Sequence, residues 1–268
     1  MPASTVRNLL VRGMLAGLVA GVIAFAFAFF VGEGPVDQSI AQESAASAPQ
    51  HVHGGDAAAP AAPAAEEEEE LVSRSLQSTA GLATGVLVYG VALGGIAALV
   101  YSFALGRIGR FSPRASAALV SAAAFTTVYL VPFLKYPATP PAVGNPDTIG
   151  KRTTLFFLMI LLSVLLGVAA LILGRRLAPR LGNWNASVVA GLAFAVAVTV
   201  AFVLLPGNGD AIKDTFPAAV LWKFRVATLG IQVVLWAAFG LVFGQLAERL
   251  LAPRQAPAAP QAAAVPAA

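Results

Sequence analysis

Six stretches of about 20 residues, each free of charged side chains, limit what this chain can fold into. They cover residues 13–32, 80–105, 115–134, 153–173, 186–205 and 226–246. A helix needs about 20 apolar residues to cross the ~30 Å hydrocarbon core of a membrane. Lipid cannot satisfy the backbone hydrogen bonds of an open strand, so such segments must be helical. We therefore predict an all-α, polytopic transmembrane bundle with about six spans.

The composition supports this prediction and argues against an enzyme. Hydrophobic residues make up 58% of the chain and charged residues 11%, whereas about 25% of a soluble domain is charged. There is no cysteine, which excludes disulfides, thiolate metal sites and cysteine nucleophiles. The two histidines, His51 and His53, lie outside every apolar stretch. No nucleophile and base are therefore expected together on a rigid element, and we expect no catalysis and no cofactor.

The distribution of arginine predicts the orientation. With the N-terminus inside, the inner segments carry ten basic residues and one acid, and the outer segments carry seven basic residues and twelve acids. The two inner loops between spans contain arginine as their only charged residue, and short inner loops are where basic residues concentrate. We predict an N-in, C-in protein of the bacterial cytoplasmic membrane. Because the basic residues belong to these loops, the sequence pI of 9.8 does not indicate nucleic acid as a partner.

The first apolar stretch allows two interpretations. Arg7 and Arg12 followed by an apolar run and small residues are also typical of a cleaved secretory signal, which would leave five spans. The run of about 18 residues is longer than the usual ~7–15-residue signal core. Gly13, Gly17 and Gly21 form a ladder of small residues that favours helix packing. We favour a retained span and leave cleavage open.

The segment after the first span has a different composition from the rest. Residues 38–70 are rich in Ala, Pro, Ser and Gln and contain five consecutive glutamates, Glu66–Glu70, a composition that cannot bury a core. We predict an N-terminal segment with the first helix over 1–37 and a disordered, acidic outer tether over 38–79. A five-helix membrane bundle follows over 80–251, and then a disordered Ala/Pro-rich tail over 252–268.

The tether offers possible metal ligands. His51 and His53 are separated by one residue, and Asp56 follows closely. Imidazole and carboxylate groups suit borderline divalent ions such as cobalt, nickel and zinc. The tether could gather such an ion near the bundle, or the two histidines could belong to a solvated spacer without a function.

A proline-rich segment between the third and fourth spans is the most distinctive motif. Residues 131–153 read VPFLKYPATPPAVGNPDTIGKRT, and their prolines exclude a regular helix. Lys135 and Tyr136 stand where membrane-interface anchors occur, and Asn145 and Asp147 supply oxygen ligands and turn caps. The segment is either a rigid tie between two helices or a gating loop at the entry of a transport pathway. We expect it to fold back onto the bundle.

The acidic residues outside the spans suggest a second way to attract a cation. Glu33 and Asp37 follow the first span, and Asp210 and Asp214 precede the sixth. Together with Asp147 they could concentrate a cation at the outer face, or they could be ordinary loop acids. No carboxylate or imidazole lies within a span, which excludes a relay of buried carboxylates. The polar groups expected at depth are hydroxyls and amides, namely Tyr89, Thr126, Thr127, Tyr129, Ser163, Thr199 and Gln232.

The proline-rich segment resembles the corresponding loop of the CbtA family, predicted cobalt transporter subunits of bacteria. The resemblance extends to LLVRGMLAGLVAG and GEGPVDQSIA near the start, to GVLVYGVALGGIAALVY, to GRRLAPRLGNWNA, and to FPAAVLWKFRVATLGIQVVLWAAFGLVFGQLAER near the end. It implies a membrane protein that takes up cobalt for cobalamin synthesis, with cobalt as the substrate. It also implies a small partner, CbtB, with one span and a histidine-rich end. The family is usually described with five spans, one fewer than the sequence indicates here. No ligand residue is carried over from the family.

Two functional hypotheses follow. The first is a subunit of an uptake transporter for cobalt or a similar divalent ion. The second is a membrane scaffold or assembly protein whose outer loops bind a partner and which transports nothing. Transport predicts outer loops that pack inward around a polar cavity, whereas a scaffold predicts a closed bundle with displayed loops. Under either hypothesis the protein could also form a homo-oligomer in the lipid membrane.

The predicted orientation can be measured with reporter fusions. Fusions after Arg110 and Arg176 should report a cytoplasmic position, because arginine concentrates in inner loops. Fusions near His53, Asn145 and Asp210 should report the outside. A periplasmic signal at Arg176 would overturn the orientation.

Overall fold

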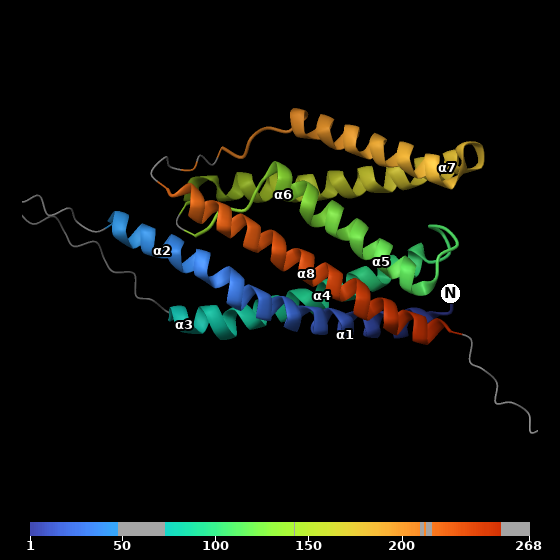
Figure 1. Cartoon of the computed structure of the whole chain (residues 1–268), viewed down its shortest axis with the longest axis horizontal. Coiled ribbons are helices and arrows are strands. Elements are labelled where there is room, and N and C mark those ends of the chain that lie inside the picture. The colour runs from blue at the N-terminus through green and yellow to red at the C-terminus, as the bar shows by residue number, and fades with distance from the viewer. Residues whose placement is uncertain (48–72, 142, 210–211, 213–215, 253–268) are drawn as a thin grey trace, which may run out of the picture.

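The computed structural model describes residues 1–47, 73–141, 143–209, 212 and 216–252, and all regular structure in these residues is helical. The all-α prediction is confirmed (Figure 1). In chain order the α-helices are α1 (Ala3–Phe27), α2 (Glu33–Ser47), α3 (Arg74–Leu76), α4 (Leu82–Ala104), α5 (Pro113–Ala124), α6 (Val131–Lys135), α7 (Ile149–Leu204) and α8 (Ala218–Leu251). Three π-helical segments, η1 (Ala28–Gly32), η2 (Gln77–Gly81) and η3 (Phe125–Leu130), and one 3₁₀ turn, η4 (Pro146–Thr148), connect them.

Five helical stretches of the described residues are long and apolar enough to cross a membrane. The longest, α7, has 56 residues, and at ~1.5 Å per residue a straight helix of that length would be far longer than a bilayer is thick. Figure 1 shows instead that α7 folds back on itself. The reversal is at Gly182, whose φ of 75° is unfavourable for residues with a Cβ. Two of the predicted spans thus lie in the two arms of α7, and the number of membrane crossings stays a prediction.

Helical structure extends into the predicted tether from both of its ends. Helix α1 continues without interruption through η1 and α2 to Ser47, so residues 38–47 are helical although the predicted tether begins at 38. Residues 74–79 are also helical, in α3 and η2. The rest of the tether, residues 48–72, lies outside the described part of the chain.

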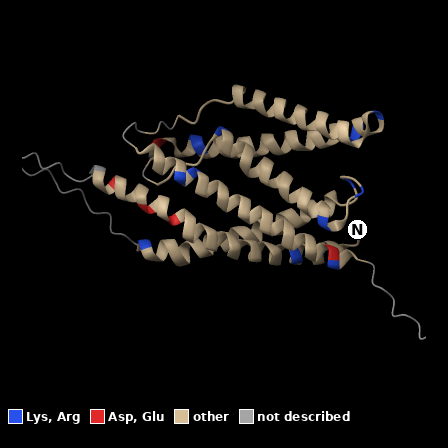
Figure 2. Ribbon diagram, viewed as in Figure 1, with Lys and Arg blue, Asp and Glu red and all other residues tan. Residues whose placement is uncertain are grey.

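Charged side chains lie almost entirely at the two ends of the bundle, and the middle is uncharged (Figure 2). We call one the arginine end: α8 ends there, beside Arg12, which donates to the Leu246 carbonyl at 2.6 Å, and Arg114, which pairs with Glu248 at 2.9 Å. The bend of α7 lies at this end too. We call the opposite end the loop end, where the proline-rich segment and the start of α8 lie. Which membrane face each end meets stays a prediction.

Glycines on α1 and α4 bring these two helices into backbone contact. A Cβ placed on Gly90 would lie 2.6 Å from the Gly17 carbonyl oxygen, and one on Gly13 would lie 2.5 Å from that of Gly94. Side chains larger than hydrogen would therefore push the helices apart. The glycine ladder predicted from the sequence is a helix-packing face, as small residues are in membrane bundles.

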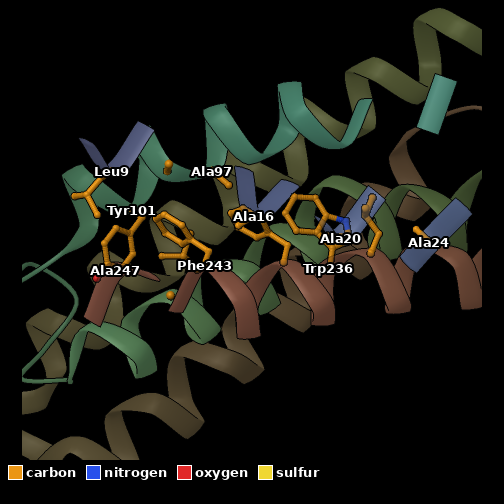
Figure 3. Packing of buried hydrophobic residues seen from close by; sticks show 14 residues of the cluster. Leu9, Ala16, Ala20, Ala24, Ala97, Tyr101, Trp236, Phe243 and Ala247 are labelled. Carbon is orange, nitrogen blue, oxygen red and sulfur yellow. The ribbon is translucent and has the colours of Figure 1, made fainter. Parts of the chain in front are cut away.

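Aromatic side chains of α8 fill the space that these small residues leave (Figure 3). Trp236 and Phe243 are buried against the alanines of α1 and α4, including the fully buried Ala16 and Ala20. The Phe243 ring meets the Tyr101 ring edge to face, with centroids 5.0 Å apart. Small residues on two helices facing large ones on a third give the close packing of a protein interior.

Helix α7 packs on η3 and α6 around a second buried cluster. The cluster joins Val131 and Tyr136 to Leu155 and Met159 of the first arm and to residues of the second arm. The buried Ser163 hydroxyl donates to the Thr127 carbonyl within η3. A π-helical segment displaces backbone carbonyls from the regular α pattern, and here a serine of the neighbouring helix takes up one of them.

The contact between α1 and α4 predicts a clear difference between two glycines of α4. Gly94→Ala should lower the stability of the purified protein by about 1–3 kcal/mol, the usual cost of overpacking. Gly85→Ala should be neutral or slightly stabilising, because no atom lies within 4 Å of a Cβ at this position and alanine favours a helix. Thermal unfolding in detergent micelles measures both, and equal stability of the two variants would contradict the packing described here.

Candidate functional site

The proline-rich segment begins with two side chains that anchor it to the end of α7. The Lys135 Nζ donates to the Phe202 carbonyl at 2.6 Å, and the Tyr136 hydroxyl donates to the Pro206 carbonyl at 2.8 Å. Burial raises the pKa of the Tyr136 phenol above its ordinary value, so its proton stays available for this bond. Lys135 and Tyr136 therefore satisfy carbonyls where α7 ends and its own hydrogen bonding stops.

Two further helices hold the middle of the segment. The fully buried Ser39 of α2 donates from its hydroxyl to the Pro141 carbonyl at 2.6 Å. The Arg225 Nε of α8 donates to the Ala138 carbonyl at 3.3 Å. The segment thus folds back onto the bundle, as the sequence analysis predicted, although Ser39 lies in the stretch that was expected to be a disordered tether.

Asn145 and Asp147 shape the start of α7. The Asn145 side-chain oxygen accepts from the Asp147 backbone N–H at 3.0 Å, and its carbonyl accepts from the Thr148 hydroxyl at 2.8 Å. An asparagine that caps a turn in this way stabilises the beginning of a helix. Asp147 itself is exposed. The geometry gives Asn145 a structural role, and a role for either residue in gating stays a prediction.

A cavity of about 490 Å³ lies beneath the proline-rich segment, at the loop end. Its walls come from five parts of the fold: η3 with α6, residues 136–139 of the segment, the first arm of α7, the connection between α7 and α8, and α8 itself. The lining residues are Tyr129, Phe133, Tyr136, Pro137, Ala138, Thr139, Ile149, Arg152, Thr153, Phe156, Phe157, Asn208 and Thr228. The cavity is therefore positioned where α7 meets the rest of the bundle. We call it the loop-end cavity.

The loop-end cavity combines aromatic walls with a few polar groups. Among the described lining residues Arg152 is the charged one, and its guanidinium donates to the Thr139 hydroxyl and the Asn145 carbonyl, both at 3.4 Å. The Tyr129 hydroxyl is shielded from solvent and has no hydrogen-bond partner among the described residues. A buried polar group of this kind is costly unless a ligand or water satisfies it. Tyr129 comes six residues before Lys135 in the chain. At a helical rise of ~1.5 Å per residue, it lies about 9 Å further from the loop end than Lys135 does.

Below the loop-end cavity, α8 carries two more buried polar atoms without partners. These are the Gln232 side-chain oxygen and the Trp236 indole nitrogen, and within the described residues neither has a hydrogen-bond partner. Gln232 and Trp236 follow the cavity residue Thr228 at intervals of four, so all three lie on one face of α8. Trp236 also lines a second hollow of about 350 Å³ between α5 and α8. Polar side chains thus continue from the cavity toward the middle of the bundle.

Two of the acidic residues that were predicted to attract a cation, Glu33 and Asp37, are paired with an arginine. Glu33 and Asp37 both pair with Arg74, the latter at 2.9 Å, so they join α2 to α3. In the part of the chain that the structure describes, no three His, Cys, Asp or Glu side chains are grouped so that they could hold a metal ion. Glu33, Asp37 and Asp147 are therefore not grouped as ligands of one metal ion, and electrostatic attraction of a cation by the outer acids stays a prediction. His51, His53, Asp210 and Asp214 lie outside the described residues.

Sequence reasoning did not identify Arg152, Ser39 or Thr228 as site residues. Arg152 was counted only as an outer charge, and Ser39 was assigned to the tether. A hydroxyl within an apolar helix, such as Thr228, is a weak signal because threonine can donate to its own helix, as Thr228 does to the Phe224 carbonyl at 2.7 Å. The useful signal for Arg152 was its place at the end of the proline-rich segment, directly before an apolar span.

The anchoring by Ser39 predicts different effects for two serines of α2. Ser39→Ala should lower stability by about 0.5–1.5 kcal/mol, because the hydrogen bond from the buried Ser39 hydroxyl to the Pro141 carbonyl is lost, and should speed hydrogen exchange in residues 136–148. Ser44→Ala is the matched control, since its exposed hydroxyl donates only to the Ile40 carbonyl of its own helix. Exchange that is unchanged in Ser39→Ala would show that α2 does not hold the segment.

Comparison with known proteins gives one match. A family model described as "Probable cobalt transporter subunit (CbtA)" matches residues 6–248. No curated protein and no solved structure matches the chain. The matched residues include every helix described above except the ends of α1 and α8.

Proposed function

The chain belongs to the CbtA family of probable cobalt transporter subunits, and on that premise we propose that it is the membrane subunit of a cobalt uptake transporter. The observation that carries the proposal is the family match over residues 6–248, which includes all five helices suited to crossing a membrane. Uptake across the bacterial cytoplasmic membrane would supply cobalamin synthesis. Since the family is named for a subunit, other subunits are implied, and a small CbtB-like membrane protein is our candidate.

The arrangement at the loop end favours a transporter over a scaffold. A scaffold would display its loops to a partner, whereas the proline-rich segment is bonded to α2, α7 and α8 and lies over a cavity. Irregular backbone near a membrane is tolerated where protein or water covers it. We infer that the loop-end cavity is where the transported species enters, and that Gln232 and Trp236 mark the continuation of its route.

Three groups of predicted residues have roles to test within this proposal. His51 and His53 would gather metal ions when they are scarce, since imidazole suits cobalt. Asp147, exposed beside the segment, would attract the cation electrostatically, as would Asp210 and Asp214. Lys135 and Tyr136 would keep the segment over the cavity.

Uptake of radiolabelled cobalt tests the proposal. Cells that express this chain with its candidate partner should accumulate cobalt faster than cells with an empty vector. Replacing His51 and His53 by alanine should lower uptake at scarce metal and spare it at saturating metal, because a gathering site matters only when the ion is limiting. Unchanged uptake at all concentrations would assign the two histidines to a spacer.

Asp147→Asn separates gating from structure within the same assay. It removes a charge at nearly constant volume, so it should lower uptake while protein abundance and membrane insertion stay unchanged. Pro140→Gly with Pro141→Gly is the structural counterpart, because it loosens the segment. Normal uptake in Asp147→Asn, with lower abundance in the proline variant, would identify the segment as a structural tie. Cells that accumulate no cobalt under any condition would favour the scaffold.

A further inference from the structure

The loop-end cavity has the chemistry of a site for a small organic molecule. Its volume of about 490 Å³ lies within the ~300–1,000 Å³ of small-molecule pockets, which are lined mainly by apolar and aromatic side chains with a few polar groups. The rings of Phe133, Phe156 and Phe157 supply such walls. A bare metal ion would gain nothing from these rings, whereas an organic molecule would bury its apolar surface against them.

Arg152 determines the charge that this molecule should carry. Its guanidinium is the charged group among the described residues that line the cavity. A guanidinium offers five N–H donors in a planar fork that matches a carboxylate. Among its interactions, the hydrogen bonds that it donates to the Thr139 hydroxyl and the Asn145 carbonyl are 3.4 Å long. The Arg152 side chain is only partly exposed, so an anion at the cavity would be less screened by water than at an open surface.

Two hydroxyl groups add donors beside Arg152. The Thr139 oxygen accepts from Arg152, which leaves the Thr139 O–H free to turn toward an acceptor. The buried Tyr129 hydroxyl has no partner in the described structure, and Tyr129 lines the cavity. An anion with hydrogen-bond acceptors would satisfy this phenol.

From these observations we propose that the loop-end cavity binds a small organic carboxylate with an aromatic-sized apolar body. The carboxylate lies against Arg152 and accepts from the Thr139 and Tyr129 hydroxyls, and the apolar body packs against the phenylalanine rings. This binding does not depend on cobalt transport. The carboxylate can arrive as the free acid anion or as the ligand of a metal chelate, and in the second case the chelate is the form in which the metal enters.

Benzoate tests the site in the full-length chain purified in detergent micelles. Saturation-transfer NMR and calorimetric titration should detect binding of benzoate, and benzamide, its neutral counterpart, should bind at least about tenfold more weakly. Arg152→Gln should weaken benzoate binding to a similar extent. Arg225→Gln is the matched comparison, because Arg225 also holds the proline-rich segment but does not line the cavity, and it should weaken binding clearly less than Arg152→Gln does.

A second variant keeps the test decisive if Arg152→Gln fails to fold. Tyr129→Phe removes one hydroxyl and should weaken benzoate binding about threefold to tenfold with the thermal stability retained. No benzoate binding to the natural chain would overturn the proposal. So would equal affinity for benzamide, or a loss of binding in Arg225→Gln equal to that in Arg152→Gln, which would show that Arg152 acts only by holding the segment.

Picolinate, which chelates cobalt through its ring nitrogen and carboxylate, identifies the source of the carboxylate. Tighter binding of picolinate with cobalt than without it would assign the site to a metal chelate, and tighter binding without cobalt would assign it to the free anion. Both results require Arg152 and support the site. Failure of cobalt uptake in cells would leave benzoate binding untouched, so the two proposals fail separately.

Discussion

The close contact between α1 and α4 is the constraint on which the rest of the structure depends. A membrane offers little hydrophobic force for helix association, so close packing and interhelical hydrogen bonds must hold a bundle together. Backbone contact at Gly13, Gly17, Gly90 and Gly94 brings the two helices together. The aromatic side chains of α8 then fill the groove beside them. Because α8 also forms a wall of the loop-end cavity, this contact sets the position of the candidate site.

The loop end shows how irregular backbone is held next to a membrane. The proline-rich segment has few donors of its own, and its carbonyls accept from Ser39 and Arg225 of two other helices. At its ends, Tyr136 and Asn145 satisfy groups at the termini of α7. Stiffness from proline and anchoring from several helices hold this segment over a cavity.

The sequence predicted the fold class and the positions of the apolar helices because lipid imposes a length and a composition that can be counted directly. It also predicted the return of the proline-rich segment to the bundle. It did not predict the helix through residues 38–47, because α2 is stabilised by tertiary contacts such as the burial of Ser39, which its composition does not reveal. The helical structure that continues on both sides of the reversal at Gly182 was likewise missed, since the reversal takes place at this one glycine.

The candidate site was harder to predict than the fold, for a physical reason. Its polar groups come from segments far apart in the sequence, such as Tyr129, Arg152 and Thr228, and each has an ordinary local explanation as an interface or helix residue. Glu33 and Asp37 show the opposite case: their sequence positions suggested a site, but their charges are neutralised in part by Arg74. Only the packing of α7 against η3 and α6 distinguishes these cases.

The central proposal is that water reaches the loop-end cavity from the loop end, so that a polar species can enter it. The chain has no cysteine, so a single cysteine at Thr228, which lines the cavity, can be labelled with a charged thiol reagent in intact membranes. Val226 is the control, because it is half-exposed on the outside of α8 and does not line the cavity, although it lies nearer the loop end. The structure predicts fast labelling at position 228 and slow labelling at 226, since thiolates form in water and not in lipid. Labelling at 226 that equals or exceeds that at 228 would contradict the account.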